Sequence, residues 1–203
     1  MKHLPNLLTG LRLVLSVLVF AGLAVAGQAP SLGATVRALL EQAAFAAFVV
    51  AAVTDFFDGW LARRWNVVSV WGAILDPIGD KVLVCAAVLG LMALSPSLAL
   101  TLAGGLILFR EFAVSALREV TAGKGVSLPV TLLAKWKTTI QLVALGAEML
   151  VAGGAAFGLP AGPERLRVAL EGGAHGLLWT AAAITLYTGA EYVAQARKAL
   201  AAR

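Results

Sequence analysis

The chain has 203 residues, of which 60% are hydrophobic and 13% are charged. Soluble domains are typically about 25% charged, so this composition, with a mean hydropathy of +0.89, excludes a water-soluble globular protein and predicts an integral membrane protein. The net charge of +5 is not arranged as a basic stripe along one segment, so nucleic acid is not an expected partner. Residues 1–203 are interpreted as a single membrane domain, because the length leaves no room for a large soluble domain as well.

Six apolar segments follow one another along the chain, each near the roughly 20 residues that a helix needs to cross a bilayer. They cover residues 10–28, 38–62, 72–95, 97–119, 131–152 and 173–195. The predicted fold class is therefore all-α, a polytopic membrane protein with six transmembrane helices and a short N-terminal juxtamembrane helix. Residues 153–173 are interpreted as a loop, because Pro160 and Pro163 interrupt them. Arg12 interrupts the first apolar run, which favours mature protein over a cleaved signal peptide.

The distribution of Lys and Arg predicts the orientation in the membrane. Suppose that both termini and the loops after the second and fourth segments face the cytoplasm. Of the 16 basic residues, 13 then lie on that side, and the other side holds Arg37, Arg165 and Arg167. Because cytoplasmic loops carry an excess of Lys and Arg, this split favours an even number of spans with both termini in the cytoplasm.

All four aspartates of the chain fall within 26 residues around the second and third segments: Asp55, Asp58, Asp76 and Asp80. On helices, the i,i+3 pair Asp55/Asp58 and the i,i+4 pair Asp76/Asp80 each project from one face. Carboxylates at membrane depth are costly and usually serve chemistry, ion handling or pairing. Four oxygen donors in two such pairs predict a site for a divalent cation, either Mg²⁺ or Mn²⁺.

Very small residues share the helix faces of these carboxylates. One predicted stripe comprises Asp55, Asp58, Gly59 and Ala62, and a second comprises Gly72, Asp76 and Asp80. The small side chains leave room for a bulky ligand, and Arg63 can reach over the first stripe toward an anion. The complete pattern, D-x2-D-G-x2-A-R-x8-G-x3-D-x3-D, resembles the signature of the CDP-alcohol phosphatidyltransferases, and all eight fixed residues are present.

The resemblance implies a role for each of these residues. The four aspartates would hold one or two Mg²⁺ or Mn²⁺ ions on the diphosphate of CDP-diacylglycerol, and Asp80 would be the general base for the acceptor hydroxyl. The pocket for cytidine and diphosphate would comprise Gly59, Ala62, Arg63 and Gly72. The segment Pro5–Arg12 also resembles the opening of this family, and this adds Asn6, Thr9 and Arg12 as diphosphate contacts. From the residues alone, Asn6 and Thr9 could instead cap a helix, and Arg12 could extend to lipid headgroups.

Cations gather at the predicted cytoplasmic ends of the fourth and fifth segments. They are Arg110, Arg118, Lys135 and Lys137, with Thr138 beside them. Several fixed cations near a metal–diphosphate site indicate an acceptor that carries its own phosphate. Residues 4–150 resemble the branch of the family that makes phosphatidylglycerophosphate in bacteria. The resemblance implies that sn-glycerol 3-phosphate is the acceptor, that these five residues contact its phosphate, and that Glu111 orients a cation. The simpler interpretation of Arg118 and Lys137 is anchoring at the membrane surface.

Other functions are compatible with parts of the pattern. Within the family, the reaction could be cardiolipin synthesis from phosphatidylglycerol or phosphatidylinositol phosphate synthesis. A divalent-cation transporter could use the same carboxylates, but it would place them near the bilayer midplane on broken helices, with an internal repeat that this sequence lacks. The family resemblance also implies a homodimer, with membrane lipids as partners. The predicted orientation places the active site at the cytoplasmic face of the inner (cytoplasmic) membrane.

Overall fold

The computed structural model describes residues 4–29, 31–65, 70–125, 132–159 and 163–201. Within these ranges it does not describe the side chains of residues 4–6, 55–65, 70–77, 80, 132, 134 and 135. Its regular elements are the helices α1 (Leu4–Gln28), α2 (Ala34–Trp65), α3 (Val70–Leu94), α4 (Leu98–Gly123), α5 (Leu132–Ala152) and α6 (Glu164–Ala201). The all-α prediction is confirmed for the part of the chain that is described.

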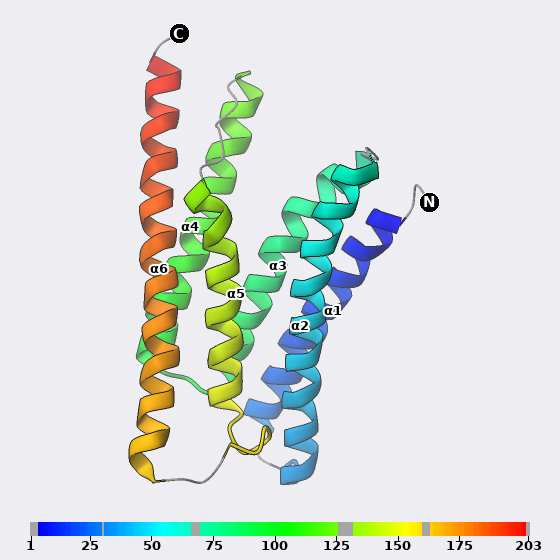
Figure 1. Cartoon of the computed structure of the whole chain (residues 1–203), viewed down its shortest axis with the longest axis vertical. Helices are drawn as coiled ribbons and strands as arrows, with labels where there is room; N and C mark the ends of the chain where they lie inside the picture. Colours follow the sequence, from blue (N-terminus) through cyan, green and yellow to red (C-terminus); the bar gives the residue numbers. More distant parts are fainter. Residues whose placement is uncertain (1–3, 30, 66–69, 126–131, 160–162, 202–203) are drawn as a thin grey trace.

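The helices run alternately up and down in a bundle (Figure 1). Helix α1 packs mainly against α2 and α3, whereas α6 packs mainly against α4 and α5. Helix α3 joins the two groups, because it also contacts α4 and α5. The start of α1 and the end of α6 lie at the same end of the bundle, together with the end of α2 and the start of α3 (Figure 1). The aspartate-bearing parts of α2 and α3 therefore lie at the end of the bundle where α1 begins and α6 ends.

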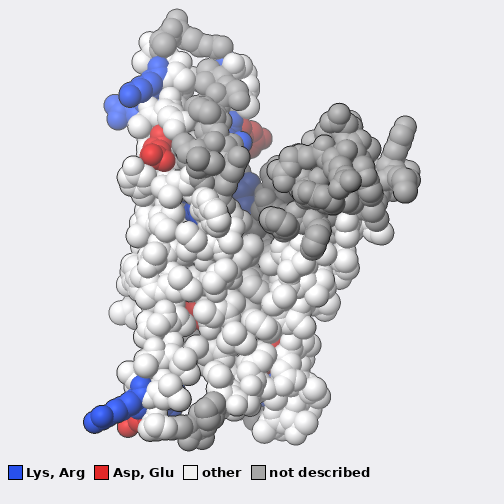
Figure 2. All heavy atoms as spheres, viewed as in Figure 1, with Lys and Arg blue, Asp and Glu red and all other residues white. Residues whose placement is uncertain are grey.

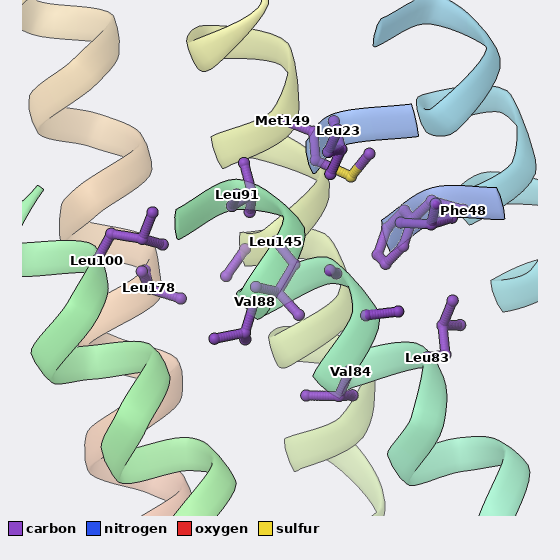
Figure 3. Packing of buried hydrophobic residues seen from close by; sticks show 14 of the residues in the cluster. Leu23, Phe48, Leu83, Val84, Val88, Leu91, Leu100, Leu145, Met149 and Leu178 are labelled. Atoms are coloured by element: carbon purple, nitrogen blue, oxygen red, sulfur yellow. The ribbon is translucent and has the colours of Figure 1, made fainter. Parts of the chain in front are cut away.

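All six helices contribute to one apolar core (Figure 3). Leu23 of α1, Phe48 of α2, Leu91 of α3, Leu145 of α5 and Leu178 of α6 are all at most 3% exposed. Lipid tails are as apolar as leucine, so close packing rather than escape from water holds such helices together in a bilayer. Small residues allow the close packing: a Cβ added at Gly27 would lie 2.2 Å from the carbonyl oxygen of Ala93, so α1 and α3 meet backbone to backbone.

The outer surface has the pattern of a membrane protein. Figure 2 shows Lys, Arg, Asp and Glu mostly at the two ends of the molecule, with a largely uncharged belt between them. Large apolar side chains point outward from this belt, such as Phe20 at 43% exposure and Val143 at 57%. Among the described residues, three helical stretches are long and apolar enough to cross a membrane: Leu7–Gln28, Ala34–Thr54 and Leu98–Gly123.

Two predictions at the ends of the chain differ from the structure. The predicted juxtamembrane helix is not a separate element, because α1 is continuous from Leu4 to Gln28. Helix α6 begins at Glu164, so the second half of the predicted 153–173 loop is helical. A hydropathy pattern misses this first part of α6 because it is charged, with an i,i+4 ion pair between Arg167 and Glu171 (3.7 Å). Pro163 directly precedes the helix, as expected of a breaker.

Candidate active site

The aspartate motif lies on two uninterrupted stretches of helix. Helix α2 continues to Trp65 and so carries the first pair, and α3 begins at Val70 and carries the second. The i,i+3 and i,i+4 spacings therefore do place each pair on one helix face. The side chains of most predicted donor-site residues lie outside the described part of the structure: Asn6, Asp55, Asp58, Gly59, Ala62, Arg63, Gly72, Asp76 and Asp80. The side chain of Lys135, from the predicted acceptor site, also lies outside it. Among the residues that are described, no three His, Cys, Asp or Glu side chains converge as a metal site.

Helix α1 brings a buried arginine against Gly79 of α3. Arg12 is 1% exposed and Thr9 is 0% exposed. Both lie against Gly79, where an added Cβ would be 3.4 Å from Arg12 Nη1 and 3.6 Å from Thr9 Cγ2. Gly79 directly precedes Asp80 in the sequence. The guanidinium of Arg12 therefore lies inside the bundle, which contradicts the interpretation that it extends to lipid headgroups. Thr9 lies in the second turn of α1 and is not its cap.

A second cluster of buried polar side chains joins α4, α5 and α6, and Glu111 is at its centre. Glu111 Oε1 accepts hydrogen bonds from Arg110 Nη1 (3.2 Å), from Gln141 Nε2 (3.4 Å) and from the ammonium of Lys137. The side chains of Arg110 and Lys137 are each 7% exposed, and that of Glu111 is 14% exposed. The predicted role of Glu111 in orienting a cation fits these bonds. Lys137 is buried, so surface anchoring does not explain it.

Helix α6 supplies the other side of this cluster. Thr188 Oγ1 accepts a hydrogen bond from Arg110 Nη2 (2.9 Å), and Thr185 Oγ1 accepts one from Gln141 Nε2 (2.7 Å). Gly189 leaves room for the arginine, since a Cβ there would lie 2.9 Å from Arg110 Cγ. Two hydrogen bonds, to Glu111 and to Thr188, therefore hold the Arg110 guanidinium inside the helix bundle, and removing either acceptor would leave a buried donor unpaired.

Arg118 and Arg110 share one aromatic ring. Tyr192 of α6 is 4% exposed and packs with Val114 and Leu117 of α4. The Cζ atoms of both arginines lie 5.9 Å from the centroid of this ring. Arg118 itself is exposed at the surface. Thr138, the remaining predicted acceptor residue, is partly buried on α5, one residue after Lys137.

The two groups of residues meet along α3. Helix α3 packs against both α4 and α5, and the Glu111 carboxylate is near enough to Cys85 of α3 to act on it electrostatically. Cys85 follows Asp80 by five residues, which corresponds to roughly 8 Å along the helix axis. Helix α3 therefore links the stretch that carries the second aspartate pair to the helices that carry the buried cations.

Sequence reasoning missed the contribution of α6 and one contact between α5 and α6. Thr185, Thr188 and Tyr192 recur at i, i+3 and i+7, and this polar stripe in an apolar helix could have identified them. In the structure, His175 Nδ1 of α6 lies 3.1 Å from Glu148 Oε1 of α5. This contact joins α5 to α6. It lies toward the opposite end of α5 from Lys137, away from the cation cluster.

Comparison with known proteins agrees with the motif. Residues 2–190 match the family model described as CDP-alcohol phosphatidyltransferase. A relative from Cereibacter sphaeroides is 40% identical over 97% of this chain and 95% of its own length, and it is named CDP-diacylglycerol–glycerol-3-phosphate 3-phosphatidyltransferase. Relatives with the same name come from Rickettsia felis (37% identical, 97% of both chains) and Escherichia coli K12 (40% identical, 74% of this chain and 76% of its own). The chain belongs to the CDP-alcohol phosphatidyltransferase family.

Proposed function

We propose that this protein is a membrane enzyme that transfers the phosphatidyl group of CDP-diacylglycerol to sn-glycerol 3-phosphate and releases CMP. The relatives named for this reaction span nearly the whole chain, including α6. The observation that supports the acceptor assignment is the buried cluster around Glu111, in which the cations Arg110 and Lys137 both contact the carboxylate. A neutral acceptor such as serine would not call for cations fixed at this position.

The donor side has the chemistry that a metal–diphosphate complex requires. Members of the family use a divalent metal ion, and a set of four carboxylates on two adjoining helices suits a hard cation such as Mg²⁺ or Mn²⁺. Asp55, Asp58, Asp76 and Asp80 would hold one or two such ions. When bound, the metal would neutralise the diphosphate and stabilise the departing CMP. The residues present fit this group, since the donors are all oxygen and small residues accompany them on both helices.

The remaining donor contacts follow from the position of α1 and from the motif. Arg12 and Thr9, buried beside Gly79, would bind the diphosphate together with Asn6. A fixed guanidinium is suited to this role because its planar donors match phosphate oxygens. Gly59, Ala62, Arg63 and Gly72 would form the walls of the cytidine pocket.

The transfer itself needs a base and an oriented acceptor. Asp80 would take the proton from the primary hydroxyl of sn-glycerol 3-phosphate. The hydroxyl oxygen then attacks the phosphorus that carries the diacylglycerol group, a new P–O bond forms, and the bond to the CMP oxygen breaks. The products are phosphatidylglycerophosphate and CMP.

The acceptor phosphate would be bound by Arg110, Arg118, Lys135, Lys137 and Thr138. Among the described charges, Arg110, Arg118 and Lys137 are positive and Glu111 is negative. Together with Lys135 they carry a net positive charge, which suits a phosphate monoester that carries about −1.5 to −2 at neutral pH. Glu111 would therefore serve two purposes: it orients the two buried cations and offsets their mutual repulsion while the acceptor is absent.

The membrane arrangement proposed from the sequence is compatible with the bundle. Six spans would place both termini and the active site at the cytoplasmic face of the inner membrane, and the common end of α1 and α6 supports this (Figure 1). A site at this face would meet a water-soluble acceptor on one side and a lipid donor on the other. Association of two copies as a homodimer remains part of the proposal.

Arg118→Ala tests the acceptor half of this proposal. Because hydrogen bonds to charged groups contribute about 1.5–3 kcal/mol, the KM for sn-glycerol 3-phosphate should rise about tenfold or more, with the KM for CDP-diacylglycerol unchanged. Steady-state CMP release at varied concentrations of each substrate measures both constants. The matched control is Arg165→Ala. Arg165 is also an exposed arginine, but it lies at the start of α6, at the opposite end of the bundle from the proposed site. Unchanged KM and rate in Arg118→Ala would exclude this arginine from the acceptor site.

A further inference from the structure

Tyr192 is the point at which α6 contacts both arginines of the proposed acceptor site. Arg110 and Arg118 are eight residues apart on α4, which separates their backbones by about 12 Å along the helix. Val114 lies halfway between them and packs against Tyr192. The ring therefore stands opposite the middle of this stretch, and each guanidinium carbon lies 5.9 Å from its centroid. A cation within about 6 Å of a ring centroid is attracted by the ring's π electrons.

The two arginines depend on this ring to different extents. Arg110 is also held by Thr188 and Glu111. The Arg118 side chain, by contrast, is exposed, and no hydrogen bond or ion pair joins it to another described residue. A long exposed side chain has many rotamers, and fixing it costs up to about 2 kcal/mol of conformational entropy. The contact with Tyr192 restricts Arg118 to the side of α4 on which Arg110 already lies.

We propose that Tyr192 is a positioning residue that sets the affinity for the phosphate of the acceptor by holding the Arg118 guanidinium toward Arg110. The proposal rests on the proposed function, and it gives α6 a role in selecting an acceptor that carries a phosphate monoester. The aromatic ring provides the effect, and the hydroxyl group is not needed. Tyr192 does not itself contact the substrate, so removing the ring changes acceptor binding without changing donor binding.

Tyr192→Leu and Tyr192→Phe separate the ring from the hydroxyl. Loss of the ring in Tyr192→Leu should raise the KM for sn-glycerol 3-phosphate by about two- to fivefold, the equivalent of a cation–π contact at an exposed arginine. The KM for CDP-diacylglycerol and the kcat should stay within about twofold of the unmodified enzyme, because Tyr192 contacts neither the donor nor the reacting atoms. Tyr192→Phe should keep all three constants near their original values. Tyr187→Leu is the matched control, since Tyr187 is the other tyrosine of the chain, also lies on α6 and is 59% exposed.

A double-mutant cycle distinguishes positioning from general packing. If Tyr192 acts through Arg118, Tyr192→Leu should have little further effect on the acceptor KM in an Arg118→Ala background, because coupled residues do not add. A purely structural role would lower the unfolding temperature and the kcat by similar amounts in both backgrounds. Additive effects on KM in the cycle would overturn the proposal.

Fluorinated phenylalanines at position 192 provide a test that preserves packing, should Tyr192→Leu fail to fold. Each added fluorine withdraws electron density from the ring face while leaving its size nearly constant, so the acceptor KM should rise stepwise with fluorination. A flat series would overturn the proposal while the function stands. Absence of turnover by the unmodified enzyme with sn-glycerol 3-phosphate would instead contradict the proposed function, and the role of Tyr192 would fall with it.

Discussion

Replacing Asp80 by Asn is expected to lower CMP release by about 100-fold or more, because general base catalysis contributes about 10² to 10⁴ to a rate. Asparagine has nearly the same shape as aspartate, but it is neutral and does not accept the proton of the acceptor hydroxyl. The substitution also removes one negative charge from a cluster proposed to hold divalent metal. The measurement is initial-rate CMP release by purified variants in detergent with both substrates saturating.

Two controls make the Asp80→Asn result specific. Glu171→Gln makes the same chemical change at the opposite end of the bundle, on a partly exposed part of α6, and should keep full activity. The unfolding temperature of Asp80→Asn should be at least that of the unmodified protein, because repulsion within the carboxylate cluster decreases. A turnover within a few-fold of the unmodified enzyme would show that another group accepts the proton.

Glu111→Ala is expected to cause the largest loss of stability among substitutions in the acceptor cluster. Arg110 and Lys137 are buried, and both bond to the Glu111 carboxylate. Removing one partner of a buried ion pair typically costs about 3–5 kcal/mol, because the remaining charge is left uncompensated. The unfolding temperature in detergent should therefore fall by many degrees. Acceptor binding should weaken too, since the two cations lose their orientation.

The matched control is Glu119→Ala, which removes an exposed carboxylate from the same helix and should leave the unfolding temperature nearly unchanged. Glu111→Gln should have an intermediate effect, because the amide oxygen still accepts hydrogen bonds but the charge is gone. Equal unfolding temperatures for Glu111→Ala and the unmodified protein would contradict the central place of Glu111 in the cluster.

The sequence allowed the helices and the donor motif to be predicted because both depend on local spacing. Apolar segments near 20 residues predict spans, and five of the six predicted segments differ from helices α1 to α5 by a few residues at their ends. The aspartate pairs could be placed on helix faces because helical periodicity relates i to i+3 and i+4. Helix α6 was predicted too short because its first turns are charged, and hydropathy does not distinguish a charged helix from a loop.

The partners across helices could not be predicted in the same way. Periodicity shows which residues share a face, but it does not show which helix lies opposite. Arg12 could therefore be interpreted as a headgroup contact, although α1 places it against Gly79 of α3. Lys137 could similarly be interpreted as a surface anchor, whereas the position of α4 pairs it with Glu111. Tyr192 and Thr188 could be recognised from the sequence only as part of a polar stripe on an apolar helix. Their role depends on contact with Arg110, which lies 78 residues from Thr188 in the sequence.

The most direct test of the proposed function is CMP release by the purified protein with CDP-diacylglycerol and Mg²⁺. It should be followed separately with sn-glycerol 3-phosphate, inositol phosphate, serine and phosphatidylglycerol as acceptors. Release should occur with sn-glycerol 3-phosphate, stop when a chelator removes the metal, and return when Mg²⁺ is restored. Release with phosphatidylglycerol or inositol phosphate but not with sn-glycerol 3-phosphate would contradict the acceptor site built around Glu111. Metal flux into liposomes with no release from any acceptor would contradict the enzyme assignment itself.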